Sequence, residues 1–332
     1  MNDGACILVG DIGGTNVRFA LARASQRRVV ISDLWKRPGA EFASFSAAIA
    51  AYRRHAAAPF DGAAFGVAGP VEAGSAQLLH RDWFIDGATI ASELGIARCV
   101  VVNDFVAMAR AAPELSGDAL VEIAPGQASP HGSIAVGGPG TGFGLAVLRC
   151  LIPQTEPGLD GWVVIGGEGG HQSFAPQTDL EWRVAENLRG VLGYVSNETI
   201  AAGAGFDATL AALADAMGVA RANISPGEVE AGAVAGDPLA LAMCRLRAQT
   251  AMTALGDAAL SANTTGGVFI AGGVAVKLAR YLKEKGALAR FRQRGARTAL
   301  LSKIPIKLIL SEEAPLLGAA HLWLDDRARG WL

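Results

Sequence analysis

The sequence predicts a two-lobed α/β protein with mixed β-sheets flanked by helices. The chain has 332 residues, which is longer than a typical single core and indicates two lobes. Its composition is 51% hydrophobic and 18% charged, so the chain has ample apolar material for a large core and no sign of disorder. Short β-type runs alternate with helical patterns, which is typical of α/β layering.

The first lobe opens with three strand-like runs, and the turn between the first two is rich in glycine, which predicts a β-meander. A helix, a strand, a helix and a strand follow, and the last strand leads into a helix from Asp104. We place this lobe at residues 1–110 and expect the closing helix, within residues 313–332, to pack back onto it. The predicted elements are strands 5–9, 17–21, 29–34, 63–67 and 98–102 and helices 42–57 and 87–94.

The second lobe, residues 111–312, repeats this plan. Residues 14–20 align with residues 140–146, since a Gly-Thr turn opens into an apolar strand in both, which favours internal duplication; chance is the alternative. The predicted elements are strands 133–136, 144–148, 162–165, 268–271 and 304–310 and helices near 179–189 and 238–262, with the closing helix starting at Pro315.

Charge and cysteine usage exclude several classes of function. The net charge is −2, the pI is near 6.2 and no Lys/Arg run stands out, so we expect no nucleic-acid partner. The four scattered cysteines form no CxxC pair and no dense framework, which favours a reducing cytoplasm. No signal segment and no unbroken apolar stretch of roughly 18 residues is present, so we expect no membrane association.

The first candidate motif runs from Asp11 through Gly13, Gly14 and Thr15 to Asn16. Paired glycines let backbone N–H groups approach phosphate oxygens, and a neighbouring acid can hold a hydrated Mg²⁺. The alternative is a hairpin turn that Asp and Asn cap with their side chains.

A second glycine-rich segment, residues 137–144, contains five glycines in the eight residues that include Gly140, Thr141 and Gly142. Such exposed backbone suits anions, and a flexible loop is the alternative. Neither GxGxxG within this run nor GxxxxGK[ST] anywhere is present, which excludes the Rossmann and P-loop accounts of phosphate binding.

Asn103 and Asp104 follow an apolar strand where a helix begins. A carboxylate at this end of a strand lies where open α/β sheets bind ligands, and there it can accept a proton from a substrate hydroxyl. Helix capping explains the same pair as an alternative.

Glu168 and His171 stand among four glycines, which predicts access to a cleft, with a surface turn as the alternative. Glu198 reads as the first turn of a helix capped by Ser196 and needs no function there. Small residues also mark two junctions between predicted elements, at Gly272–Gly273 and at residues 314–320. A flat nucleobase can lie against backbone atoms there, and close helix packing explains these glycines equally well.

In this order, the segments resemble the bacterial glucokinase family over residues 9–322. The resemblance implies the actin-like, ribonuclease H-like ATPase fold, phosphorylation of glucose at the 6-hydroxyl by ATP, and closure of the lobes over the substrates. Asp104 would be the general base, and the sugar ligands would be Asn103, Asp104, Glu168, His171 and Glu198. ATP would contact Asp11, Gly13, Gly14, Thr15, Asn16, Gly140, Thr141, Gly142, Gly272 and Gly273, with Mg²⁺ held through water at Asp11.

One departure from the family concerns the sugar pocket, where Leu79 and His80 stand in place of Thr-Asn before Trp83. A kinase for another hexose or an amino sugar is therefore an alternative, and a catalytically silent sugar-binding regulator is a second. The resemblance also implies a small-molecule sugar as partner and a cytoplasmic homodimer that acts in glycolysis.

Overall fold

The computed structural model describes residues 4–25, 28–78, 81–151, 161–220 and 224–329. The chain divides into two compact units. Unit 1 comprises Met1–Ser116, Leu148–Gly166 and Ser311–Leu332, and unit 2 comprises Gly117–Val147 and Gly167–Leu310. The lobe boundaries expected from the sequence stay a prediction.

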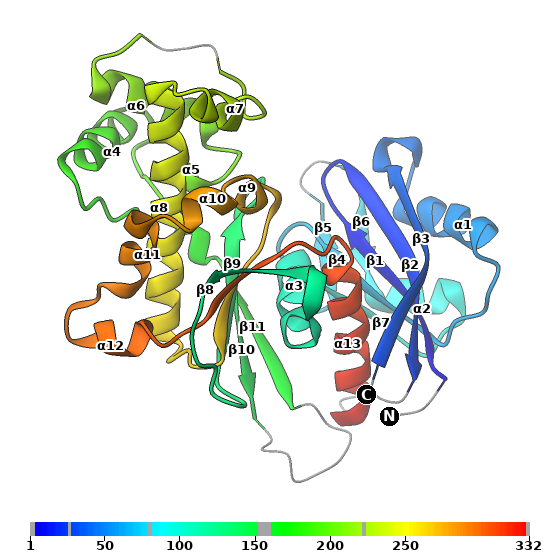
Figure 1. Ribbon diagram of the computed structural model, residues 1–332. Coiled ribbons are helices and arrows are strands. Elements are labelled where there is room, and N and C mark those ends of the chain that lie inside the picture. The colour runs from blue at the N-terminus through cyan, green and yellow to red at the C-terminus, as the bar shows by residue number, and fades with distance from the viewer. Residues whose placement is uncertain (1–3, 26–27, 79–80, 152–160, 221–223, 330–332) are drawn as a thin grey trace. The chain divides into compact units, whose positions relative to one another are not determined.

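Unit 1 contains a five-stranded sheet in the order β3-β2-β1-β4-β7 (Figure 1). The first three strands form the predicted meander, in which β2 pairs antiparallel with both β1 and β3. Strand β4 is parallel to β1, and β7 is parallel to β4. The bounds are β1 Cys6–Ile12, β2 Asn16–Ser25, β3 Arg28–Pro38, β4 Gly62–Val67 and β7 Cys99–Asn103.

The two faces of this sheet carry different cores because successive strand residues point to opposite sides. Leu8 and Phe19 face an aromatic core that also contains Phe45 of α1 (Phe45–His55). Val9 and Ala20 face a core of small residues closed by α13 (Ala314–Arg329). The remaining unit 1 elements are the short hairpin of β5 (Ser75–Gln77) and β6 (Phe84–Asp86), α2 (Gly87–Leu94) and α3 (Asp104–Ala111).

Helices α3 and α13 pack together unusually closely at Gly318. A Cβ atom at this position would lie 1.7 Å from the backbone oxygen of Ala107, so close helix packing accounts for this glycine. Farther along, the fully buried Arg110 of α3 forms ion pairs with Glu114 at 2.9 Å and with Asp325 of α13 at 2.6 Å. The closing helix is therefore fixed to α3 by both shape and charge.

The second sheet has six strands in the order β11-β10-β9-β12-β13-β8. Most of it belongs to unit 2, whereas the end of β10 from Leu148 and β11 up to Gly166 are assigned to unit 1. Its first five strands repeat the order found in unit 1, with β12 parallel to β9 and to β13. Strand β8 is added antiparallel to β13. The bounds are β8 Leu120–Ala124, β9 Ile134–Pro139, β10 Phe143–Cys150, β11 Trp162–Gly167, β12 Gly267–Ile270 and β13 Ile306–Ile309.

The helices of unit 2 surround α8 (Pro238–Ser261), which starts at the cap residue Asp237 with Pro at its first position (Figure 1). Most of α8 is buried, so it forms the centre of the helical core. The other helices are α4 Asp179–Leu192, α5 Asn197–Ala201, α6 Phe206–Met217, α7 Val229–Val234, α9 Gly273–Lys277, α10 Ala279–Leu282, α11 Lys285–Arg292 and α12 Thr298–Leu301.

None of the helices in the described part of the chain combines the length and the apolar character that crossing a bilayer requires.

We expect Gly318→Ala to lower the free energy of unfolding by about 1–3 kcal/mol, because the added methyl meets the backbone of α3. The matched control is Gly190→Ala in α4, where a Cβ atom would have no neighbour within 4 Å. This control should raise stability by about 0.5–1 kcal/mol, since alanine is the better helix former. Thermal and urea unfolding measure both; equal effects of the two substitutions would contradict the packing argument.

Candidate active site

The carboxyl ends of three parallel strands meet at one edge of the unit 1 sheet. Ile12 of β1 is the register partner of Val67 of β4, and Val67 is the partner of Asn103 of β7. Neighbouring strands are about 4.8 Å apart, so the ends of β1 and β7 lie about 10 Å apart. The residues that follow these strands, Gly13 to Asn16 and Asp104, therefore belong to the same edge of the sheet.

The first glycine motif forms the tight turn between β1 and β2. The Gly13 amide donates to the Asn16 carbonyl at 3.0 Å, and the Gly39 amide donates to the Thr15 carbonyl at 3.0 Å. After β4, the Ala68 amide donates to the Ile12 carbonyl at 2.9 Å and fixes the base of the turn. The hairpin predicted as the alternative is thus present, and it leaves the predicted phosphate-binding role compatible with the geometry.

Asp11, near the end of β1, is the acidic group of this turn. Burial raises the pKa of its carboxyl above the ordinary value, and the cations of Arg18 and Lys36 partly offset the rise. Arg18 Nε lies 3.7 Å from Asp11 Oδ2, and Arg18 also donates to the Glu312 carbonyl at 2.9 Å. The carboxylate is therefore held on one side by a cation.

Metal-binding capacity near Asp11 is small. Among the described residues, no three His, Cys, Asp or Glu side chains gather as a metal site. Magnesium in phosphoryl-transfer sites is commonly held by one or two carboxylates together with water and substrate phosphates. A single carboxylate at Asp11 fits that kind of donor set and does not fit a cage made of protein ligands alone.

Asn103 and Asp104 occupy the start of α3. The Asn103 side chain caps the helix, since its Oδ1 accepts from the Phe105 amide at 2.9 Å and its Nδ2 donates to the Gly69 carbonyl at 3.0 Å. Asp104 Oδ1 accepts from the same amide at 2.8 Å. Capping, the alternative predicted for this pair, is therefore correct for Asn103, and these bonds also fix the position of Asp104.

Close packing beneath α3 depends on a glycine of β4. A Cβ atom at Gly66 would lie 3.2 Å from Ala107 Cβ and 3.4 Å from Asp104 Cα. The helix that begins with Asp104 therefore lies directly against the sheet, which brings the Asp104 backbone close to the strand ends.

The second glycine segment joins β9 to β10 in unit 2. Its carbonyls are occupied by another turn, because the Gly203 amide donates to Gly140 O and the Ala204 amide donates to Thr141 O, both at 2.9 Å. The Gly140 amide donates to the Gly142 carbonyl at 2.7 Å. The segment is thus an ordered turn rather than the flexible loop that was the alternative.

Gly272 lies against this turn. Its φ is +110°, and a Cβ atom there would lie 2.4 Å from the Pro139 carbonyl oxygen, so only glycine fits. A Cβ atom at the next residue, Gly273, would have no neighbour within 4 Å. The predicted nucleotide residues of unit 2, Gly140 to Gly142 with Gly272 and Gly273, are therefore brought together.

Glu198 lies next to the second glycine turn. Its Oε2 accepts from the Phe143 amide at 2.7 Å, and its Oε1 lies 3.7 Å from His171 Nε2. Helix α5 holds Glu198 through a capping box between Ser196 and Thr199, as the sequence predicted for the cap. The structure thus brings Glu198, His171 and the turn at Gly142 together.

The glycines that follow Glu168 have a packing role. Gly169 and Gly170 are buried, and a Cβ atom at either would lie 2.1 Å from atoms of β10, namely Leu145 Cδ2 and the Phe143 carbonyl oxygen. The side chains of Glu168 and His171 are exposed. Access of Glu168 and His171 to a cleft stays a prediction.

The predicted site residues thus form one group in each unit. Asp11, Gly13 to Asn16, Asn103 and Asp104 belong to unit 1, whereas Gly140 to Gly142, Glu168, His171, Glu198, Gly272 and Gly273 belong to unit 2. The convergence of the two groups stays a prediction. Leu79 and His80 lie outside the described residues.

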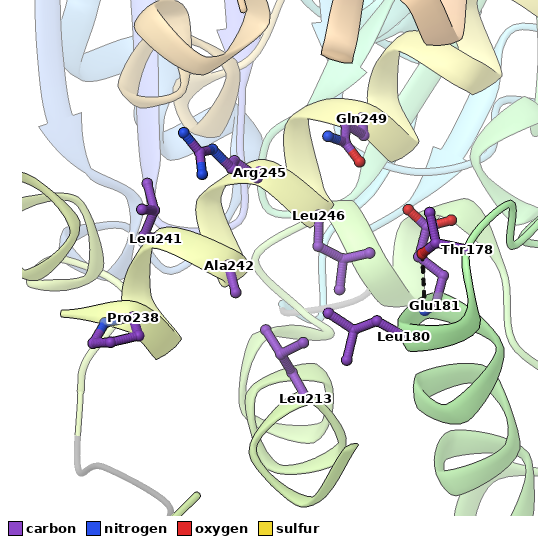
Figure 2. A pocket seen from close by; sticks show the side chains of 10 residues that line it. All are labelled: Thr178, Leu180, Glu181, Leu213, Pro238, Leu241, Ala242, Arg245, Leu246 and Gln249. Atoms are coloured by element: carbon purple, nitrogen blue, oxygen red, sulfur yellow. Dashed lines mark hydrogen bonds between the residues drawn. The ribbon is translucent and has the colours of Figure 1, made fainter. Parts of the chain in front are cut away.

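A cavity of about 320 Å³ lies elsewhere in unit 2, between α4, α6 and α8 (Figure 2). Its lining is largely apolar, with Leu180, Leu213 and Leu246, and the polar residues that line it include Glu181 and Gln249. None of the predicted site residues lines it. The Glu181 carboxylate is already paired with Arg290 and with the Gln177 amide.

Comparison with known proteins decides the family. The sequence model of the glucokinase family matches residues 8–326. A glucokinase of Saccharophagus degradans is 34% identical over 322 residues, which cover 96% of this chain and 98% of that protein. The chain belongs to the glucokinase family. It is accordingly an ATP-dependent sugar kinase, a transferase that acts on a small-molecule sugar.

Solved structures of glucokinases share the fold. The crystal structure of a glucokinase from an Antarctic psychrotroph is 33% identical, has a TM-score of 0.86, and covers 97% of this chain and 99% of that chain. A ROK family glucokinase from Streptomyces griseus, solved in complex with glucose and AMPPNP, is 19% identical with a TM-score of 0.60, covering 96% of this chain and 99% of its own. The fold is therefore the expected actin-like ATPase fold.

Replacing Asp11 by Asn should stabilise the protein at neutral pH and reduce its activity. Because the folded-state pKa of Asp11 is raised, its ionisation above the ordinary carboxyl pKa of about 3.9 favours the unfolded state. The stability gain of Asp11→Asn should therefore grow as the pH rises from about 3.9 and vanish in more acidic solution. Urea unfolding across pH measures the gain, and a gain independent of pH would contradict the assignment of the buried charge.

Proposed function

We propose that the chain transfers the γ-phosphoryl group of ATP to the 6-hydroxyl of glucose and so forms glucose 6-phosphate. The observation that carries this proposal is the register row of Ile12, Val67 and Asn103, which places the first glycine turn and Asp104 at one sheet edge. The name of the Saccharophagus degradans relative supports glucose as the acceptor, and the AMPPNP complex of the Streptomyces griseus protein supports ATP as the donor.

Asp104 is proposed as the general base. Its carboxylate would accept the proton of the 6-hydroxyl as that oxygen attacks the γ-phosphorus, which is the role of an aspartate in kinase chemistry. The Phe105 amide at 2.8 Å orients one carboxylate oxygen. Asn103 fixes the preceding backbone through the cap, and we propose that its amide also contacts the sugar.

The donor side of the reaction is proposed to use backbone amides of both glycine turns. Gly13 to Asn16 in unit 1 and Gly140 to Gly142 in unit 2 would hold the phosphates in line with the acceptor oxygen. Bound Mg²⁺, held through water near Asp11, would supply charge neutralisation at the β- and γ-phosphate oxygens. We propose that the backbone at Gly272 and Gly273 contacts the adenosine, and a Cβ atom at Gly273 would have no neighbour within 4 Å.

We propose Glu168, His171 and Glu198 as ligands of the sugar hydroxyls. Carboxylate and imidazole groups can accept from or donate to a hydroxyl in pairs. Glu198 Oε1 and His171 Nε2 are 3.7 Å apart, which is a separation at which one hydroxyl can contact both. A wrong epimer would leave such groups without partners, which is how a sugar site discriminates.

A cytoplasmic homodimer that feeds glycolysis completes the proposal. The four cysteines, all within the described residues, form no disulfide with one another, in keeping with a reducing compartment. Sedimentation of the purified chain tests the dimer.

Asp104→Asn should reduce kcat for glucose phosphorylation by about 10²–10⁴-fold, because the amide cannot accept the hydroxyl proton. The side-chain carbonyl of Asn can still accept the hydrogen bond from the Phe105 amide, so the thermal unfolding midpoint should change little. The control is Asp118→Asn in the exposed turn Gly117–Ala119, which should retain wild-type rates. A coupled assay of ADP release measures both, and activity of Asp104→Asn within a few-fold of wild type would refute the base assignment.

A panel of sugars tests the acceptor. The kcat/KM for glucose should exceed that for mannose, fructose and glucosamine by about tenfold or more, since each misplaced hydroxyl leaves a buried polar group unpaired. If another sugar leads, the chain is a kinase for that hexose or amino sugar. If no sugar yields ADP although sugar binding is measurable, the silent regulator replaces the enzyme.

A further inference from the structure

Arg81 contacts the first glycine turn from the segment that joins β5 to β6. Its Nη2 donates to the Gly14 carbonyl at 3.0 Å and to the Thr15 carbonyl at 2.8 Å, and its Nε lies 3.4 Å from the Gly14 carbonyl. The guanidinium also lies over the ring of Trp83, 5.0 Å from the centroid. One planar cation thus holds two successive carbonyls of the turn.

The peptide geometry gives these contacts a consequence for the turn. The described peptide bonds are all trans, so each C=O points opposite to the N–H of the same peptide unit. When Arg81 holds the carbonyls of Gly14 and Thr15, the N–H groups of Thr15 and Asn16 are directed to the other side. A hydrogen bond at the carbonyl also polarises the peptide and makes its N–H a stronger donor.

The second glycine turn provides an internal comparison. Gly140 and Thr141 correspond to Gly14 and Thr15 in the sequence alignment of the two halves, and their carbonyls are also both occupied. There the donors are the backbone amides of Gly203 and Ala204, at 2.9 Å each. In unit 1 the side chain of Arg81 makes the equivalent pair of bonds.

Gly39 leaves the space that the guanidinium needs. A Cβ atom at Gly39 would lie 1.6 Å from Arg81 Nη1 and 2.2 Å from its Cζ. Gly39 also donates from its amide to the Thr15 carbonyl at 3.0 Å, so this residue and Arg81 meet at the same oxygen. Its φ lies outside the left-handed region, so alanine is compatible with the backbone, and the nearest atoms that its methyl would meet belong to the Arg81 guanidinium.

We propose that Arg81 is a positioning residue for phosphoryl transfer, which acts through the Gly14 and Thr15 carbonyls to direct the amides of the first glycine turn at the phosphates of ATP. This inference rests on the proposed function, because that function assigns the turn to the phosphates. It goes beyond that function by coupling the segment before Trp83 to the nucleotide.

The experiment measures ATP and glucose separately in the full-length chain. Arg81→Ala should raise the KM for ATP, and the dissociation constant of a non-hydrolysable ATP analogue, by about tenfold or more, the loss expected for charge-assisted hydrogen bonds. The KM for glucose should change by much less. Arg81→Lys should recover only part of the affinity, because an ammonium does not reproduce the planar fork.

Gly39→Ala is a second way to disrupt the contact of Arg81 with the first glycine turn, because the added methyl occupies the space of the guanidinium. It should weaken nucleotide binding in the same direction, and combining it with Arg81→Ala should add little, because both remove one interaction. The matched control is Arg53→Ala, another arginine over an aromatic ring, at 5.9 Å from the centroid of Phe60; it should leave both KM values unchanged.

The inference is overturned if folded Arg81→Ala binds the ATP analogue with an affinity within about twofold of wild type. Such a change is well below the loss expected for one hydrogen bond. If Arg81→Ala does not fold, Gly39→Ala decides by the same criterion. Failure of the proposed function is a separate result, since wild type would then bind the ATP analogue but release no ADP with any sugar, and the binding measurements on the variants would still decide the role of Arg81.

Discussion

The parallel pairing of β1, β4 and β7 is the constraint on which the unit 1 part of the site depends. Because the sheet is covered on both faces, a slip of one residue would exchange the aromatic core at Leu8 with the small-residue core at Val9. Glycines lock this arrangement from inside: a Cβ atom at Gly10 would lie 2.7 Å from the ring of Phe65. With the register fixed, the ends of β1 and β7 are fixed too, and the turn after β1 and the helix after β7 have one possible relative placement.

The two units show how one backbone plan can be stabilised in two chemical ways. Both sheets share the order of their first five strands, which supports the duplication that the short Gly-Thr alignment suggested. In unit 2, the turn that joins α5 to α6 donates the backbone amides of Gly203 and Ala204 to the carbonyls of Gly140 and Thr141. In unit 1 a long side chain makes the bonds instead. A backbone amide donor is kept when the side chain of its residue is substituted, whereas a guanidinium donor is lost with its side chain. The first turn therefore depends far more on a single side chain.

Much of the fold was predictable because the signals are local. Helix α2 has the predicted bounds, and α8 ends one residue before the prediction, since the cap residues Asp86 and Asp237 mark where these helices begin. Strand β8 was missed: it is short, three of its five residues are only half-buried or exposed, and its pairing partner β13 is distant in sequence. The candidate site motifs could be proposed from the sequence because glycine and carboxylate patterns at strand ends are local as well. Arg81 was missed because its contacts with Gly14 span 67 residues, and the packing role of Gly169 was not predicted because its neighbour Leu145 lies in β10, apart from it in the sequence.

The C-terminal helix is tied to both segments of unit 1 that carry proposed site residues. Just before α13, the Glu312 carbonyl accepts from Arg18, which in turn lies 3.7 Å from Asp11. Within α13, Gly318 lies against the backbone of α3, and Asp325 forms an ion pair with Arg110 of α3. Helix α3 begins with Asp104, so α13 contacts the supports of both the acid of the glycine turn and the proposed base. The last helix of the chain therefore helps to fix the relative positions of Asp11 and Asp104. The geometry of the proposed unit 1 site is complete only after this helix has packed.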